Sequence, residues 1–258
     1  MSFIRVLWRA PLGLAWTLLS HWHWVWRRFL FPKRWRDSYS TDIIGRWGRG
    51  LAWIMGMRIV ERNQRSGPMG DIIVANHMGF LDVPLLLSFF PAVFIIKGEM
   101  RKAPYFGRAL SKHGHVFVDR GSEASRRSAR AGVRRVLEAG ERLIVFPEGR
   151  ASPGAERRPF KPFCFIEAER QGKLVEACVI DYLPDRSQLE WDVNRGMIPQ
   201  LIELVGRRRT TVSIEYLGAF VPQDGAADAE RIRELVEGKL RAHDAERAPP
   251  SADHSTDH

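Results

Sequence analysis

Short apolar runs alternate with longer amphipathic segments along most of this chain of 258 residues. DIIVA at 71–75, AVFII at 92–96 and LIVF at 143–146 are almost continuously apolar, which is typical of strands buried on both faces of a parallel sheet. The longer segments repeat apolar positions every three or four residues and predict helices. The alternation predicts an α/β fold with a largely parallel or mixed central sheet flanked by helices.

The pattern also gives the bounds of these elements. Strands are predicted at Met57–Glu61, Asp71–Ala75, Ala92–Ile96, Val116–Val118, Leu143–Phe146, Val175–Ile180 and Thr211–Tyr216. Helices are predicted at Asp82–Phe89, Tyr105–Lys112, Ser122–Ala139, Phe163–Arg170, Ile198–Val205 and Ala229–Arg241. We therefore divide the chain into an N-terminal helical region (1–56), an α/β domain (57–242) and a polar, proline-containing tail (243–258) that we expect to be disordered.

The N-terminal region differs in composition from the rest of the chain. Eight of the nine tryptophans lie at or before Trp53, and residues 1–50 carry nine Lys or Arg but two acidic residues. Tryptophan together with cations is typical of a membrane interface. We expect one helix that lies in or dips into a single leaflet, helped by a second helix around residues 40–56. The apolar stripe of the first helix consists of Trp8, Leu12, Trp16, Leu19, Trp22, Trp26 and Leu30.

The N-terminal region also allows other interpretations than a helix at the membrane interface. A membrane-spanning helix needs about 20 predominantly apolar residues, but Thr17, Ser20, His21 and His23 interrupt the apolar stretch. A helix packed on the domain with its outer face in water also fits the pattern. The net charge of +10 suits nucleic-acid binding, but here the cations are interleaved with tryptophans on an apolar stripe. A membrane surface is therefore the expected partner, and no nucleic acid is expected.

Polar clusters follow four of the predicted strands. They are Asn76-His77, Lys97-Gly98-Glu99, Asp119-Arg120 and Pro147-Glu148-Gly149-Arg150. Because functional sites in α/β folds lie at the carboxyl ends of the strands, we expect these clusters to converge on one cleft.

His77 and Asp82 are the first candidates for chemistry in this cleft. Five residues apart, they would not face each other on one helix, so contact requires His77 in the turn and Asp82 at the start of the next helix. The carboxylate could then bind one imidazole nitrogen and leave the other as a general base. The alternative is a capping aspartate beside an unrelated surface histidine.

The other reactive side chains add little to this picture. No Gly-x-Ser-x-Gly elbow is present, and Cys164 and Cys178 lie in apolar surroundings, as expected for reduced core residues of a cytoplasm-facing protein. His113 and His115 lack a further ligand at metal-binding spacing, so no metal site is expected. The simplest chemistry is deprotonation of a substrate hydroxyl that attacks an activated acyl carbon, with Lys97, Arg120 and Arg150 suited to a phosphate-bearing substrate.

Four motifs in order resemble those of the glycerolipid acyltransferase family, specifically the bacterial 1-acylglycerol-3-phosphate acyltransferases. Asn76-His77 through Asp82 resembles the Asn-His-x4-Asp motif, and Phe117–Arg120 the hydrophobic pair followed by Asp-Arg. Phe146–Gly149 matches Phe-Pro-Glu-Gly, and Phe160-Lys161 the Phe-Lys that follows it. Lys97–Met100 resembles a Lys-x-Glu-Leu element between the first two motifs. The resemblance covers roughly Asp71–Tyr182.

The resemblance implies a role for each matching residue. His77 would be the general base and Asp82 its orienting partner. Lys97 and Arg120 would hold the acceptor's phosphate, while Glu148 and Gly149 would shape the acceptor site. The donor would be a fatty-acyl thioester of acyl carrier protein or CoA, with no further cofactor. The product would be phosphatidic acid, made at the cytoplasmic face of the cell membrane by a peripheral or monotopic enzyme.

Two departures from the family pattern concern the acceptor. The family continues Phe-Pro-Glu-Gly with Thr-Arg-Ser, whereas this chain has Arg150-Ala151-Ser152. Arg150 would then replace the phosphate-binding arginine, or the head group differs. Ala177 and Cys178 also stand where the family's fourth motif has proline. Acylation of lyso-ornithine lipid or another lysolipid therefore stays open, as does a non-catalytic lipid-binding relative.

Overall fold

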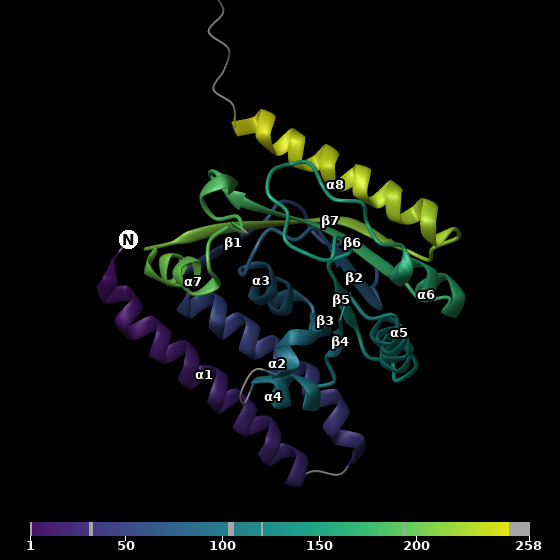
Figure 1. The fold of residues 1–258 in the computed structure, drawn as a ribbon, viewed down its shortest axis with the longest axis horizontal. Coiled ribbons are helices and arrows are strands. Elements are labelled where there is room, and N and C mark those ends of the chain that lie inside the picture. Colours follow the sequence, from purple (N-terminus) through teal and green to yellow (C-terminus); the bar gives the residue numbers. More distant parts are fainter. Residues whose placement is uncertain (1, 31–32, 103–105, 120, 193, 248–258) are drawn as a thin grey trace, which may run out of the picture.

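The computed structural model describes residues 2–30, 33–102, 106–119, 121–192 and 194–247. Its seven strands form one sheet in the order β1-β7-β6-β2-β5-β3-β4 (Figure 1). Neighbouring strands are parallel except β6 and β7, which form an antiparallel pair. The predicted α/β fold with a mixed sheet is confirmed. The strands are β1 (Met57–Glu61), β2 (Ile72–Ala75), β3 (Val93–Lys97), β4 (Val116–Val118), β5 (Leu143–Val145), β6 (Val175–Leu183) and β7 (Thr210–Phe220).

Helices cover both faces of the sheet (Figure 1). Helices α6 and α8 pack together on one face, with α5 beside them, while α2 packs on α3 across the other face. The helices are α1 (Phe3–Leu30), α2 (Lys33–Ile54), α3 (Asp82–Phe89), α4 (Phe106–Lys112), α5 (Glu123–Glu138), α6 (Phe163–Gln171), α7 (Met197–Gly206) and α8 (Gly225–Arg247), with short 3-10 helices η1 (Gly98–Lys102) and η2 (Arg186–Gln188).

The centre of the sheet explains where the polar clusters meet. β2 is fully buried between β5 and β6, and the chain leaves it through α3 to reach β3 on the far side of β5. The chain leaves β5 in the opposite direction, through α6 to β6, and the carboxyl ends of two such neighbouring strands are where α/β folds form a ligand-binding crevice. Every residue of β2 and β5 is buried, so both faces of these strands require apolar side chains. This accounts for their continuous apolar sequences.

The structure differs from several predicted element ends, and two of these differences involve buried polar residues. β6 continues past Ile180 to Leu183, because buried Asp181 is paired with Arg186, Arg247 and His243 instead of ending the strand. α8 continues to Arg247, so residues 243–247 are helical and the predicted tail began too early. His243 is buried, with one ring nitrogen 3.0 Å from Asp181 and the other 2.9 Å from Glu215. Residues 248–258 lie outside the described part of the chain.

The N-terminal helices are packed on the domain. Ile44 of α2 and Met55, which directly follows it, belong to the same buried core as the sheet. The predicted apolar stripe of α1 is exposed at Trp8, Leu12, Leu19, Trp22, Trp26 and Leu30. Trp16 is the exception, since its Nε1 donates to the Trp47 carbonyl of α2 at 3.1 Å. Within the described residues, no helix combines the length and hydropathy that crossing a bilayer requires.

His21 and His113 help to hold α1 on the domain, and His115 lies next to them in the packing of β3. His21 Nδ1 lies 3.2 Å from His113 Nε2, and the Trp24 and His113 ring centroids are 4.2 Å apart. The Phe94 amide donates to His115 Nδ1 at 3.0 Å. Burial lowers the pKa of His113 to about 3 and that of His115 to about 4, so both rings are neutral near pH 7. They act as packing residues rather than as part of the sheet-edge site.

The contact between α2 and α3 gives a test of this packing. A Cβ added at Gly48 would lie 2.6 Å from Leu87 Cβ, whereas one added at Gly238 in α8 would meet nothing within 4 Å. We expect Gly238→Ala to raise the free energy of unfolding by about 0.5–1 kcal/mol through helix propensity. Gly48→Ala gains the same helix propensity, but overpacking against Leu87 costs about 1–3 kcal/mol. We therefore expect Gly48→Ala to lower the free energy of unfolding. Urea unfolding of both variants checks this, and equal stabilisation would contradict the packing.

Candidate active site

The turn after β2 brings His77 and Asp82 together. His77 lies in the turn and Asp82 is the first residue of α3, as contact between them requires. His77 Nδ1 is 2.7 Å from Asp82 Oδ2. Asp82 is fully buried, while the His77 side chain keeps 24% of its surface exposed. The predicted contact is therefore present, with the carboxylate inside and the imidazole at the surface.

Four described groups donate to the Asp82 carboxylate. Oδ2 accepts from the Met78 amide at 2.7 Å and the Gly79 amide at 3.0 Å, in addition to the His77 ring. Oδ1 accepts from the Tyr182 hydroxyl at 2.6 Å. Burial, and after it the charge of Asp82, raise the pKa of Tyr182, so its hydroxyl keeps the proton that it donates. An ionised carboxylate only accepts, so Nδ1 carries the ring proton and Nε2 is left as a base.

A second buried carboxylate fixes the backbone of the same turn. Glu148 Oε1 accepts from the His77 amide at 2.9 Å, and Oε2 accepts from the Arg158 amide at 3.4 Å. The Arg157 guanidinium lies 3.5 Å from Glu148, and both side chains are fully buried. The Ser152 amide donates to the His77 carbonyl at 2.9 Å. Glu148 therefore holds His77 in place through protein contacts.

Two neighbours complete the setting of the imidazole. The Phe146 ring stacks on the His77 ring with centroids 4.1 Å apart and an interplanar angle of 12°. Asn76 pairs with the Ile180 backbone, accepting from its amide at 2.8 Å and donating to its carbonyl at 2.9 Å. β5 and β6 thus restrain the turn from both sides. Gly149 has φ of +79°, which only glycine adopts readily, so the chain can reverse after Glu148.

Two of the predicted cations, Lys97 and Arg150, lie in the described residues, at the end of β3 and in the loop after β5. Lys97, at the end of β3, is exposed and forms an ion pair with Glu99 at 2.7 Å. Arg150 is exposed in the loop after Glu148. A Cβ at Gly98 would lie 3.2 Å from Asp119 Cβ, so the ends of β3 and β4 approach closely. Arg120 lies outside the described residues.

The site includes residues that the sequence did not reveal. Tyr182 is a hundred residues from Asp82, and neither its spacing nor its neighbours mark it. Arg157 is one of several arginines in a polar loop, yet its guanidinium is buried and donates to the carbonyls of Ser152, Pro153 and Gly154. Tyr182 meets its partner only through the fold, and nothing in the sequence distinguishes Arg157 from its neighbouring arginines.

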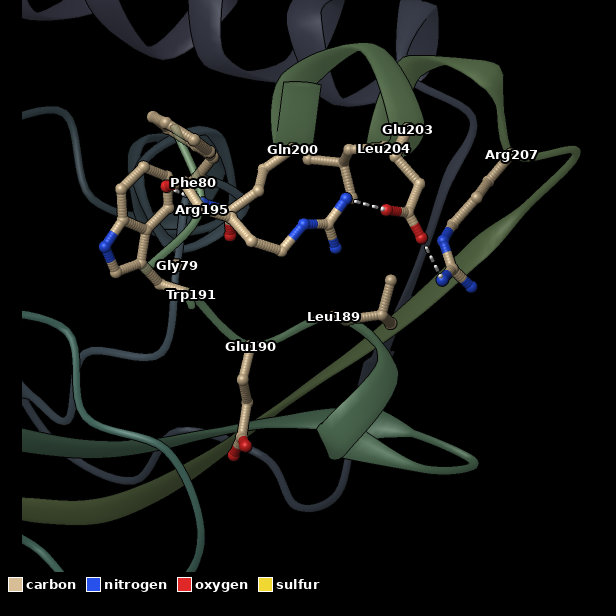
Figure 2. Close-up of a pocket in the computed structure, with 10 residues that line it drawn as sticks. All are labelled: Gly79, Phe80, Leu189, Glu190, Trp191, Arg195, Gln200, Glu203, Leu204 and Arg207. Carbon is tan, nitrogen blue, oxygen red and sulfur yellow. Dashed lines mark hydrogen bonds and ion pairs between the residues drawn. The ribbon is translucent and has the colours of Figure 1, made fainter. Parts of the chain in front are cut away.

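A small cavity of about 40 Å³ opens behind the turn (Figure 2). Gly79 and Phe80 line it together with Trp191 and residues of α7, and Glu203 bridges Arg195 and Arg207 across it. A cavity of this size holds a few water molecules and no lipid chain.

The remaining reactive groups do not join the site. Burial raises the pKa of Cys164 to about 12 and that of Cys178 well above its ordinary value, so neither thiol forms a thiolate readily. Among the described residues, no three histidine, cysteine, aspartate or glutamate side chains are grouped as metal ligands. What the arrangement provides is an oriented imidazole at a crevice.

Comparisons with known proteins identify the family. Residues 57–177 match the family model described as Acyltransferase. Over 233 residues the chain is 30% identical to the lyso-ornithine lipid O-acyltransferase of Brucella abortus, an alignment that covers 83% of this chain and 86% of that protein. The chain belongs to the acyltransferase family. The resemblance read from the four motifs is thereby confirmed.

Two further relatives of this acyltransferase are informative. It is 27% identical over 201 residues to the 1-acyl-sn-glycerol-3-phosphate acyltransferase of Neisseria meningitidis, covering 76% of this chain and 78% of the relative. Its structure resembles the crystal structure of the 1-acyl-sn-glycerophosphate acyltransferase from Thermotoga maritima, with a TM-score of 0.64 over 93% of this chain and 98% of that chain. At 23% identity, that likeness shows the fold alone.

The buried carboxylate gives a test that needs no substrate. Tyr182→Phe removes the donor to Asp82 Oδ1, and a buried acceptor left unpaired costs about 1–3 kcal/mol of unfolding free energy. The matched control is Tyr216→Phe, whose hydroxyl donates to exposed Glu61 at 3.0 Å. Water can replace the Tyr216 hydroxyl as donor to Glu61, so we expect Tyr216→Phe to lower the free energy of unfolding by less than about 1 kcal/mol. Equal losses in urea unfolding would mean that the Tyr182 bond does not satisfy Asp82.

Proposed function

We propose that this acyltransferase moves a fatty acyl group from an acyl thioester to the hydroxyl of 1-acylglycerol-3-phosphate, giving phosphatidic acid. The observation that carries the proposal is the 2.7 Å contact between His77 Nδ1 and the buried Asp82 carboxylate. It leaves Nε2 unprotonated at the crevice, which suits general-base catalysis. A non-catalytic lipid-binding relative would have no use for an imidazole oriented in this way.

The proposed reaction proceeds by direct transfer. His77 Nε2 takes the proton of the acceptor hydroxyl as the oxygen attacks the thioester carbon. The tetrahedral intermediate then collapses, the carbon–sulfur bond breaks, and the thiol leaves with the proton held by the imidazolium. Asp82 stabilises that imidazolium and keeps the ring orientation. Neither cysteine takes part, because burial keeps both protonated.

The remaining residues of the site are assigned to binding. Arg150 is exposed beside the crevice and suits the acceptor's phosphate, together with Lys97 and Arg120. Glu148 and Gly149 shape the acceptor side by fixing the His77 backbone and the chain reversal that follows. No cofactor is proposed beyond the donor, which is a thioester of acyl carrier protein or CoA.

We further propose that α1 associates with the cytoplasmic face of the cell membrane without crossing it. The exposed face of α1 carries three tryptophans and several leucines, and an amphipathic helix of this kind lies in the headgroup region. The acceptor, a membrane lipid, would then reach the crevice from the bilayer.

A second acceptor has specific support. Arg150 stands one place earlier than the family's phosphate-binding arginine, and Lys97 is already paired with Glu99. Both features favour an acceptor with less phosphate charge. A lyso-ornithine lipid is the alternative acceptor, in line with the name of the Brucella abortus relative.

Acyl transfer by wild type and His77→Ala tests the proposal. Each protein receives a labelled acyl thioester and, in parallel, lysophosphatidic acid, other lysophospholipids and lyso-ornithine lipid. We expect the variant to lose about 10²–10⁴-fold in rate, as for removal of a general base. His77→Ala should keep the unfolding midpoint of wild type within a few degrees, since the side chain is partly exposed.

The acceptor panel separates the outcomes. If wild type prefers lysophosphatidic acid, the main proposal is supported. If it prefers lyso-ornithine lipid, the proposed reaction stands but the acceptor is the lyso-ornithine lipid. Equal transfer by wild type and variant would contradict the role of His77.

A further inference from the structure

Helix α7 presents an exposed apolar face that the proposed reaction does not use. Met197 is 52% exposed, Ile198 65%, Leu201 37% and Ile202 38%. Their spacing places them on one side of the helix, and Gln200 and Glu203 lie on the other. A cluster of large apolar side chains in water marks a contact surface. We call these four residues the α7 face.

Helix α7 packs beside α1 (Figure 1). The Ser2 amide donates to the Gly206 carbonyl at 3.1 Å, and Arg5 Nε donates to the same carbonyl at 2.9 Å. Arg9 is buried and donates to the carbonyls of Val205 and Arg207 at 3.1 and 2.6 Å. The carboxyl end of α7 is thereby fixed to the first turns of α1, whose Ile4 and Trp8 are exposed. Both helices therefore carry exposed apolar side chains on one packed unit.

Cations border this surface. Arg208 and Arg209 follow α7 directly and are exposed, while Arg195 and Arg207 flank Glu203. Apolar side chains bordered by arginine match the acyl and headgroup layers of an anionic bilayer. A contact between two copies of the chain would instead bring two sets of these arginines together, which like-charge repulsion disfavours.

Other residues of α7 adjoin the turn that holds His77. Gln200 and Leu204 of α7 line the small cavity whose opposite wall is Gly79 and Phe80 (Figure 2). The Trp191 amide, in the segment leading to α7, donates to the Met78 carbonyl at 2.8 Å. A bilayer in contact with α7 would thus lie close to the turn that holds His77.

We propose that the α7 face binds an anionic lipid bilayer as a second contact beside α1 and holds the bilayer surface next to the His77 turn. The proposal rests on the proposed function in taking the membrane as the source of the acceptor. It predicts that α7 contributes to membrane affinity separately from α1, through both apolar burial and charge.

Flotation of the full-length protein with vesicles tests this surface. The vesicles contain phosphatidylcholine with or without phosphatidylglycerol. Ile198→Asp is expected to lower binding to the anionic vesicles by about tenfold or more, since a buried isoleucine side chain contributes about 1.5–3 kcal/mol. The matched control is Leu235→Asp on α8, at a leucine that is 44% exposed and away from α1 and α7. It should bind like wild type, and added salt should weaken wild-type binding.

Acyl transfer in the same samples separates this proposal from the proposed function. With a short-chain acceptor dissolved as monomers, Ile198→Asp should keep wild-type activity, whereas with acceptor embedded in vesicles it should lose activity in step with binding. Equal vesicle binding by Ile198→Asp and Leu235→Asp would overturn the α7 proposal. So would a wild-type dimer in vesicle-free solution that Ile198→Asp dissociates. If no protein transfers acyl groups but Ile198→Asp still lowers binding, the surface stands and the proposed function fails.

Discussion

The hydrogen bonds to the buried Asp82 carboxylate set the geometry of the whole site. Two come from backbone amides of the turn, one from the His77 ring and one from Tyr182 on β6. A buried carboxylate is tolerated only when such donors surround it. The turn must therefore fold tightly around Asp82, and β6 must lie beside β2 to supply Tyr182. The same carboxylate thus links the turn after β2 to β6 and orients the imidazole.

Glu148, the acidic residue of the Phe-Pro-Glu-Gly motif, also helps to position His77, from the loop that follows β5. Glu148 holds the His77 amide and is neutralised by buried Arg157, which in turn orders the loop after Gly149. A motif residue can thus be indispensable to a site without reaching the substrate. In the proposed function, the groups left to meet an acceptor are the His77 ring and the cations at the sheet edge, Arg150 and Lys97. The buried carboxylates orient the imidazole, and these more exposed groups would meet the substrate.

Much of the fold could be predicted from the sequence because local patterns determine it. Apolar runs gave β2, β3 and β5 to within a residue or two, and the polar clusters marked the edge where His77, Lys97 and Arg150 lie. Two of the errors share a cause. The pattern ends β6 at Ile180 and α8 at Arg241, yet Asp181 and His243 beyond these ends are buried because they pair with each other. Tyr182 was missed for the same reason, since its partner is distant in sequence.

The central claim is that Asp82 fixes the tautomer of His77, and ¹⁵N NMR of the histidine rings tests it most directly. The His77 signals are assigned by their loss in His77→Gln, and the couplings of the ring nitrogens to carbon-bound protons report which nitrogen is protonated. With the ring neutral, a protonated Nδ1 and a bare Nε2 are predicted. A bare Nδ1 with a protonated Nε2 would contradict the account, because the nitrogen facing the crevice would then be no base.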